Sequence, residues 1–332
     1  MKRERSSNSA PILAKRQRDA PFREPTIAVR ITDIPLFQQL VHIGSSVSHT
    51  CEISVSPGKI MLKGMDSSQL SCYTSQLNVE TPDWLATTET IPGPFFVDLT
   101  LIEPGLNTKL YEKLNHSHSQ DAQLLMRIRP NERISLSMTG FSDQRSPYAG
   151  RHRVMLLDSS PVSVAVESLN YTHTVKFPVS DLKAILNQLS QMKFQEIEFS
   201  IFNSESGQHS ALRIFAKSLR NECEHNFFSY GPPDSEMCFS GRPENEPGAP
   251  EAMDIGDMKL VLSQSFLCAN INNVVKAMRD HYVRFSFARD QPLCIRYDFN
   301  STSFLQYFLS FVMPDCDPEM ADMPPIPALF DE

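Results

Sequence analysis

The chain has 332 residues, of which 41% are hydrophobic and 21% charged, and its formal net charge is −8 at pH 7. That length can form one or two hydrophobic cores, and the negative charge argues against a protein whose whole surface binds nucleic acid. No stretch approaches the ~18 consecutive apolar residues of a membrane helix, and scattered cysteines without a CxxC pair exclude a disulfide framework or a zinc-site pattern. We therefore expect a globular intracellular protein with no membrane association.

Residues 1–25 are rich in Arg, Lys, Ser and Pro and poor in apolar residues, so we expect a disordered basic arm. Two basic clusters in this arm have the spacing of a bipartite nuclear localisation signal, which predicts a location in the nucleus: Lys2, Arg3, Lys15, Arg16 and Arg18. An arm that grips nucleic acid, or a chance occurrence, is the alternative interpretation.

From Ile27 onward, a strand, one helix and several further strands follow each other, and this pattern recurs. The helices are predicted at residues 34–47, 105–116, 178–192 and 266–282. In the second of them, Leu106, Leu110 and Leu114 form one apolar face. Four such units predict a modular repeat, with two units in each of two domains.

The two predicted domains span residues 26–157 and 174–313. Between them, residues 158–173 have no helical period, which favours an extended connector. A stretch rich in Pro, Gly and Glu predicts a mobile loop at residues 229–257, and the acidic, Pro-rich tail at 314–332 is expected to be unstructured.

The polar turn Asp66-Ser67-Ser68 lies between two strand-like runs and raises the question of a nucleophile with its acid. No His accompanies these residues, and the chain contains no P-loop and no HExxH motif. Cys223 and His225 are the nearest pair of metal-ligand types, and two ligands do not make a site. The turn is therefore interpreted as a tight connection between strands, and we predict no enzymatic activity, no metal and no cofactor.

Four stretches of the chain resemble, in the right order, the family of proliferating cell nuclear antigen, PCNA, the eukaryotic and viral sliding DNA clamp. They are "GMDSSQLSCYTSQL", "RVMLLD", "TVKFPVSDLKAILNQLSQM", and "PLCIRYDF" followed by "FLQYFLSFV", and together they cover roughly residues 26 to 313. The resemblance implies an α+β DNA-clamp fold. In that fold two similar domains each contain two β-α-β-β-β modules, with the helices lining an inner face and the sheets outside.

The resemblance also implies a function in DNA replication and repair. Clamp subunits of this family form a ring around duplex DNA and tether the polymerase, so that its local concentration on DNA becomes high. We expect a processivity factor that binds double-stranded DNA without sequence preference, a homotrimeric ring, and as partners a DNA polymerase, other clamp-binding proteins and a clamp loader. The long inserts and the basic arm suggest a divergent member, such as that of a large DNA virus.

Cations on the module helices are the expected contacts to the DNA phosphates. The candidates are Lys109, Lys113, Lys183, Lys193, Lys276 and Arg279, with His281 beside them. The first helix departs from the family, because it offers only His42 and His49, which are largely neutral at pH 7.

The resemblance places a hydrophobic partner pocket between the domains, beneath the connector. Its expected residues are Met65, Gln69, Leu70, Val162, Val164, Ser310, Phe311 and Val312. Phe311 stands where the family has a proline, which predicts a narrower pocket. Two alternatives stay open: the connector packs on its own core, or "PPIPALF" in the tail folds back as a cap.

Ring closure in the family pairs an edge strand of one subunit with an edge strand of the next. Here the expected edges are residues 150–156 and 211–217, and the expected contact residues are Arg151, Arg153, Met155, Leu212, Ile214 and Ala216. Arg213 and Lys217 place cations on the second edge as well, and like charges placed opposite each other are destabilising. A dimer, a monomer or a mixed ring therefore stays open, including a subunit of a heterotrimeric DNA-damage checkpoint clamp.

Overall fold

The computed structural model describes residues 27–79, 93–106, 123–129, 133–141, 147–157, 169–206, 209–230, 237–238, 255–278 and 281–312. Within these ranges the order strand, helix, three strands occurs four times, which confirms the predicted repeat. The basic arm, most of the connector, most of the loop after residue 230 and the tail lie outside the described residues.

The first domain contains modules 1 and 2. Module 1 comprises β1 (Ile27–Ile31), α1 (Ile34–Val47), β2 (Thr50–Ser56), β3 (Lys59–Met65) and β4 (Ser71–Asn78). Module 2 comprises β5 (Phe95–Asp98), α3 (Leu99–Leu106), β6 (Gln123–Arg129), β7 (Arg133–Phe141) and β8 (Pro147–Met155).

The second domain contains modules 3 and 4 and two short additions. Module 3 comprises β9 (His173–Pro178), α5 (Val179–Gln191), β10 (Glu196–Asn203), β11 (His209–Lys217) and β12 (Glu222–Tyr230). Module 4 comprises β14 (Lys259–Leu267), α6 (Cys268–Ala277), β15 (Tyr282–Phe287), β16 (Leu293–Asp298) and β17 (Phe304–Leu309). Between them lie β13 (Met237–Cys238), which pairs in parallel with β9, and the 3-10 turn η1 (Ile255–Asp257).

Each module gives its first strand to the sheet of the neighbouring module. Sheet A therefore has the order β1-β6-β7-β8, and sheet C has the order β12-β11-β10-β14. The remaining strands form sheet B, with the order β13-β9-β15-β16-β17-β4-β3-β2-β5. Sheet B runs through both domains, because β17 pairs antiparallel with β4 from Phe304↔Gln76 to Leu309↔Ser71.

The strands follow the period-2 rule, so one face of each sheet is apolar and buried. In β1, for example, Ile27, Val29 and Ile31 are buried while Arg30 is exposed. The apolar faces share one core with the buried stripes of the helices, such as Leu182, Ile185, Leu186 and Leu189 of α5. Among the described residues, no helix is long and apolar enough to cross a membrane.

A helix that was not predicted, α3, begins at Leu99, directly after β5. Of the predicted second helix at residues 105–116, only residues 105 and 106 are described, and they are the last two residues of α3. Asp98 caps its start, because its carboxylate accepts hydrogen bonds from the backbone N–H of Thr100 at 2.9 Å and from the Thr100 hydroxyl at 2.6 Å. Leu106 ends the described part of this helix, and the predicted face residues Leu110 and Leu114 lie outside the described residues.

Tyr73 fixes the packing of α1 on sheet B. This fully buried ring lies so close to Gly44 of α1 and Gly64 of β3 that a Cβ atom on either glycine would come within 2.6 Å or 2.5 Å of it. Only residues without a side chain fit at these two positions.

Candidate interaction surfaces

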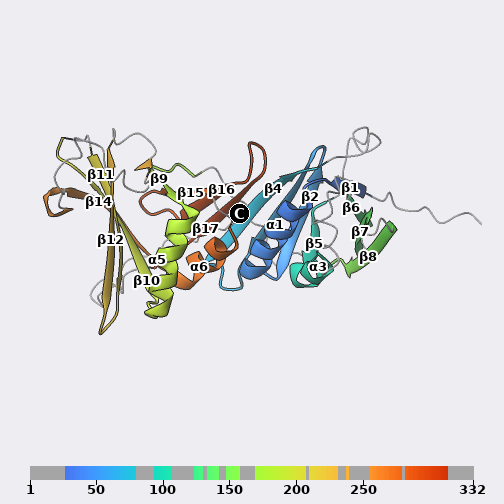
Figure 1. The fold of residues 1–332 in the computed structure, drawn as a ribbon, viewed down its shortest axis with the longest axis horizontal. Helices are drawn as coiled ribbons and strands as arrows, with labels where there is room; N and C mark the ends of the chain where they lie inside the picture. Colours follow the sequence, from blue (N-terminus) through green and yellow to red (C-terminus); the bar gives the residue numbers. More distant parts are fainter. Residues whose placement is uncertain are drawn as a thin grey trace, which may run out of the picture.

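The helices lie in one row on the same side of the sheets, in the order α5, α6, α1, α3 (Figure 1). The row crosses the boundary between the domains where α6 contacts α1. There the Gln39 side-chain amide donates a hydrogen bond to the carbonyl of Ala277 at 2.9 Å. The four helices thus form one continuous surface, as the predicted inner face requires.

That helix surface carries few charges in the part of the chain described. Lys276 and Lys193 are exposed, whereas Lys183 is half-buried and donates a hydrogen bond to the carbonyl of Met278. On α1, the exposed ring of His42 lies 2.6 Å from a Glu103 carboxylate oxygen. Of the other predicted residues, His281 and His49 are exposed, and Lys109, Lys113 and Arg279 lie outside the described residues.

The turn between β3 and β4 is held by its own aspartate. The Asp66 carboxylate accepts hydrogen bonds from the Ser71 backbone N–H at 3.1 Å and from the Ser68 hydroxyl at 2.6 Å. Gln69 has a φ of 59°, which completes the reversal of the chain. These contacts give Asp66 and Ser68 a structural role in the turn.

The turn and the C-terminal segment of the described chain meet, as the predicted partner pocket requires. The Ser310 backbone N–H donates to the Leu70 carbonyl at 2.8 Å. Leu70 is exposed, Met65, Phe311 and Val312 are half-buried, and the side chains of Gln69 and Ser310 face solvent. The connector residues Val162 and Val164 lie outside the described residues, so this surface is known on two of its three expected sides.

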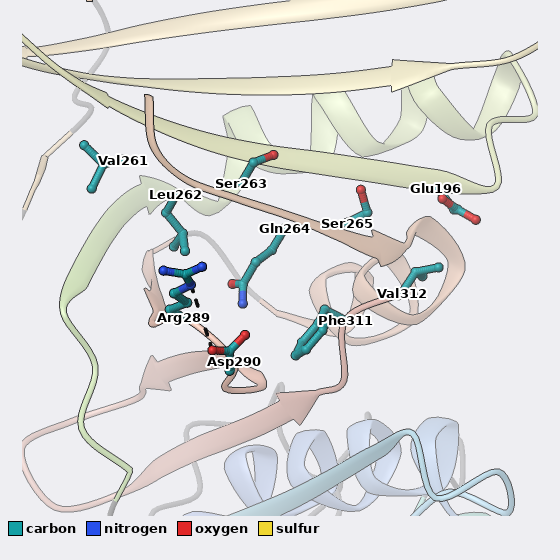
Figure 2. Close-up of a pocket in the computed structure, with 10 residues that line it drawn as sticks. All are labelled: Glu196, Val261, Leu262, Ser263, Gln264, Ser265, Arg289, Asp290, Phe311 and Val312. Carbon is teal, nitrogen blue, oxygen red and sulfur yellow. Dashed lines mark ion pairs between the residues drawn. The ribbon is translucent and has the colours of Figure 1, made fainter. Parts of the chain in front are cut away.

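A groove of about 720 Å³ continues this surface along the free edge of β14 (Figure 2). Phe311 and Val312 border it on one side, residues 261–265 of β14 on another, and the ion-paired Arg289 and Asp290 on a third. Val312 already donates a backbone hydrogen bond to the Ser265 carbonyl at 2.7 Å. The groove cannot be predicted from the sequence, because only the sheet order places β14 at an edge.

Gln264 gives the groove a polar group. Its side-chain amide donates hydrogen bonds to the carbonyls of Ala288 and Gln291, which tie β14 to the segment that follows β15. Its amide oxygen is buried and has no hydrogen-bond partner among the described residues.

One of the two predicted subunit edges is wrong. β8 is an edge strand of sheet A, with Arg151, Arg153 and Met155 exposed, as expected. β11, however, lies inside sheet C between β10 and β12, and Leu212, Ile214 and Ala216 on it are buried in the core. The free edge is β12, one strand further along the chain, and Figure 1 shows β8 and β12 at opposite ends of the molecule.

The charge of this corrected edge is also different from the prediction. Arg213 is engaged within its own sheet, where it contacts a Glu198 carboxylate oxygen at 3.0 Å and lies over the Phe202 ring at 5.3 Å. Burial raises the pKa of Glu198, but hydrogen bonds from Ser200, Arg213 and Ser263 outweigh this effect and hold the pKa below its ordinary value. The exposed residues of β12 include the acids Glu222 and Glu224.

In the described ranges, the His, Cys, Asp and Glu side chains do not cluster into a metal site. No group of three or more His, Cys, Asp or Glu side chains there could hold a metal ion. The Cys223 sulfur lies 3.4 Å from the His225 ring, and this pair has no third ligand type beside it among those residues. Burial raises the pKa of the thiols of Cys51, Cys72 and Cys294 to about 12, so they stay protonated at neutral pH.

Known proteins resemble this chain in structure but not in sequence. No protein-family model and no curated protein matches it. The proliferating cellular nuclear antigen of Entamoeba histolytica matches with a TM-score of 0.58 and 14% identity, over 86% of this chain and 99% of that chain. A structure of the PCNA2–PCNA3 complex from Sulfolobus tokodaii matches with a TM-score of 0.57 and 13% identity, over the same 86% and 99%. The chain therefore has the PCNA-like sliding-clamp fold. Because the sequence identity is so low, these matches are evidence for the fold alone.

Proposed function

We propose that this chain, which has the fold of a sliding clamp, is a processivity factor that encircles duplex DNA and tethers a DNA polymerase and other replication or repair proteins. The observation that carries the proposal is the combination of one continuous helix row with two free, oppositely charged edge strands at the two ends of the molecule. A subunit of this form can join head to tail and close into a ring with its helices inside.

Ring closure proceeds by antiparallel pairing of β8 of one subunit with β12 of the next. Both strands have nine residues. On β8 the exposed cations are Arg151 and Arg153, and on β12 the exposed anions are Glu222 and Glu224, so the edges attract each other. The repulsion between edges that the sequence suggested is thereby removed, and a homotrimeric ring is the assembly we propose.

The inner surface holds DNA by enclosing it more than by attracting it. Its described cations, such as Lys193 and Lys276, are few and exposed, which suits weak contacts to phosphates without base recognition. A ring needs little affinity to stay on DNA, because a closed ring leaves it only at an end.

Partner proteins bind at the surface that joins Leu70, Ser310 and Phe311 to the groove along β14. An extended peptide segment there can pair with the free edge of β14, as Val312 already does at Ser265. The basic arm, with its two clusters, directs such a clamp to the nucleus.

A mixed ring is the second candidate assembly. The Sulfolobus match is a complex of PCNA2 with PCNA3, two different chains. A checkpoint-type subunit, which forms a ring with non-identical chains, is expected to have the same fold. Its edge strands are expected to differ from those of a homotrimeric clamp.

Native mass in solution tests the proposal. Light scattering over a concentration series should give three times the 37.6 kDa chain mass. At salt concentrations well above about 200 mM, where contacts to phosphates are weak, the ring should then remain on circular duplex DNA and leave after the circle is cut, since a ring slides off a free end. A chain that stays monomeric at all concentrations contradicts the homotrimer, and closure only with a second, non-identical chain supports the mixed ring.

A further inference from the structure

Five arginines meet on the outer face of sheet A, away from the helices. A hollow of about 300 Å³ is lined by Arg127, Arg129, Arg133, Ser135, Arg151 and Arg153, which come from β6, β7 and β8. We call this site the arginine hollow. Among the residues that the structure describes, only arginines and this serine line it.

Strand register explains why these side chains converge. Ser135 of β7 lies between Arg127 of β6 and Arg153 of β8, and Arg129 lies directly opposite Arg133. Their neighbours along the strands, such as Ile128, Ile134 and Val154, are buried in the core on the other face. The period-2 alternation therefore places every one of these arginines on the outward face.

None of the five positions needs a cation to fill the core, because all five side chains lie on the outward face. The chain as a whole is acidic, with a formal net charge of −8, so this concentration of positive charge runs against its overall composition. Positive charge that is concentrated in this way attracts anions.

We propose that the arginine hollow binds the phosphate backbone of DNA on the outside of the molecule, as a second DNA contact separate from the helix row. Guanidinium groups bind phosphates through two parallel hydrogen bonds, and the Ser135 hydroxyl in the centre adds a further donor. The site is open and formed by exposed or half-buried side chains, which suits a chain of phosphates sliding across it.

The spacing of the cations favours a polyanion over a single phosphate. Adjacent strands lie about 4.8 Å apart and alternate residues along a strand about 6.7 Å apart, so the five guanidiniums form a grid that spans several charges. Double-stranded DNA presents one phosphate charge for about every 1.7 Å of its axis. The acidic tail of the chain offers fewer charges, because prolines and apolar residues separate its acids.

Ring closure does not compete for the whole hollow. Arg151 and Arg153 lie on the edge strand β8, where they also face the next subunit, whereas Arg127 and Arg129 lie two strands further in. The inference does not depend on the ring, because a monomer carries the complete hollow.

The test is binding of the full-length protein to a covalently closed duplex circle without a loader, at salt concentrations between about 50 and 200 mM. The variant R127Q/R129Q removes two exposed guanidiniums from the hollow. The control variant K59Q/K259Q removes two cations from β3 and β14, outside the hollow. Circular dichroism and thermal unfolding check that both variants fold.

We expect R127Q/R129Q to weaken binding at least about tenfold at low salt. Because each phosphate contact contributes about 0.9 to the slope of log affinity against log salt, the slope should fall by about two. The control should retain the affinity and slope of the wild type. The complex should also survive cutting of the circle, since binding at the outer face does not depend on a closed ring.

Three results overturn the inference. In the first, R127Q/R129Q binds with the wild-type affinity and slope. In the second, all binding is lost when the circle is cut. This result supports the clamp function and shows that the arginine hollow does not bind DNA. In the third, the full-length chain does not bind the circle and its hollow cross-links to residues 314–332, which assigns the hollow to the acidic tail.

Discussion

Sheets A and C are built on the same plan at the two ends of the molecule, yet their outward faces carry different charges. Each has three strands of one module and the first strand of its neighbour. On sheet C the outward Arg213 is paired with Glu198, and the edge strand exposes Glu222 and Glu224. On sheet A the outward residues form the arginine hollow. The inward alternate residues fix the fold, so the outward ones are free to acquire separate functions.

The largest effect is expected from inverting the charge of the sheet A edge. R151E/R153E places acids opposite the acids of β12, and we expect the assembly to dissociate to the mass of one chain in light scattering. The reciprocal change E222R/E224R on β12 should do the same alone. Combining all four changes should restore the assembly, since opposite charges again face each other.

The contrary outcome is a four-fold variant that is folded but does not reassemble, while both double variants are folded and dissociated. That result would show that the arginines of β8 and the glutamates of β12 do not pair directly across the interface. Unchanged mass in the two double variants would place the contact elsewhere on the subunit.

A second prediction concerns sheet B, which holds the two end sheets in their relative positions. Gly64→Ala should lower the free energy of unfolding by about 1–3 kcal/mol, because its Cβ overlaps the buried Tyr73 ring. Denaturant unfolding measures this value. Ser54→Ala, on the neighbouring strand β2 and half-buried, is the control and should change stability by less than about 0.5 kcal/mol. Equal stability of the two variants would show that the packing around Tyr73 relaxes freely.

The two outward faces themselves can be compared by matched arginine substitutions. Arg213→Met on sheet C removes the ion pair with Glu198 and the contact with the Phe202 ring, and should destabilise the protein by about 1 kcal/mol. Arg127→Met on sheet A should be neutral or slightly stabilising, because it relieves repulsion within the hollow. Thermal unfolding at low salt distinguishes the two. A larger loss of stability in Arg127→Met than in Arg213→Met would contradict this expectation.

The smallest effect is a pH dependence confined to sheet C. The pKa of Glu198 is lowered in the folded state, so its ionised form stabilises the fold above the pKa of the unfolded chain. That contribution is lost as the pH falls through the folded-state pKa. The stability difference between wild type and Glu198→Gln should therefore be constant from neutral pH down to about 4.5 and shrink below it. A difference that grows on acidification would contradict the lowered pKa.

The repeat and the fold could be predicted from sequence, because strand alternation and helical stripes recur in the same order four times. The edge assignment failed because the third strand after the helix of module 3, "ECEHNFFSY", alternates only weakly and was not predicted from the sequence. Without that strand, the expected edge was β11, which carries cations, whereas the actual edge strand β12 exposes acids. Helix α3 was not predicted before residue 105, because it follows β5 without a loop and Asp98 both ends that strand and caps the helix.

The functional surfaces were predictable only in part. The turn at Asp66 and the segment at Ser310 could be placed together through the family resemblance, whereas the β14 side of the groove depends on the sheet order. The arginine hollow did leave a signal, since arginines alternate in "RIR" and "RHR" on separate predicted strands. What the sequence alone could not supply is that β6, β7 and β8 lie side by side in register.

The pairing of β4 with β17 also governs when the protein can finish folding during its synthesis. Residues 71–76 have their strand partners at residues 304–309, near the far end of the chain. The edge of β4 therefore stays unpaired from its own synthesis until β17 is made more than two hundred residues later, and the first domain is completed while this edge is still open. An unpaired strand edge is a template for pairing with other chains, so premature termination before β17 should leave a domain that is prone to aggregate.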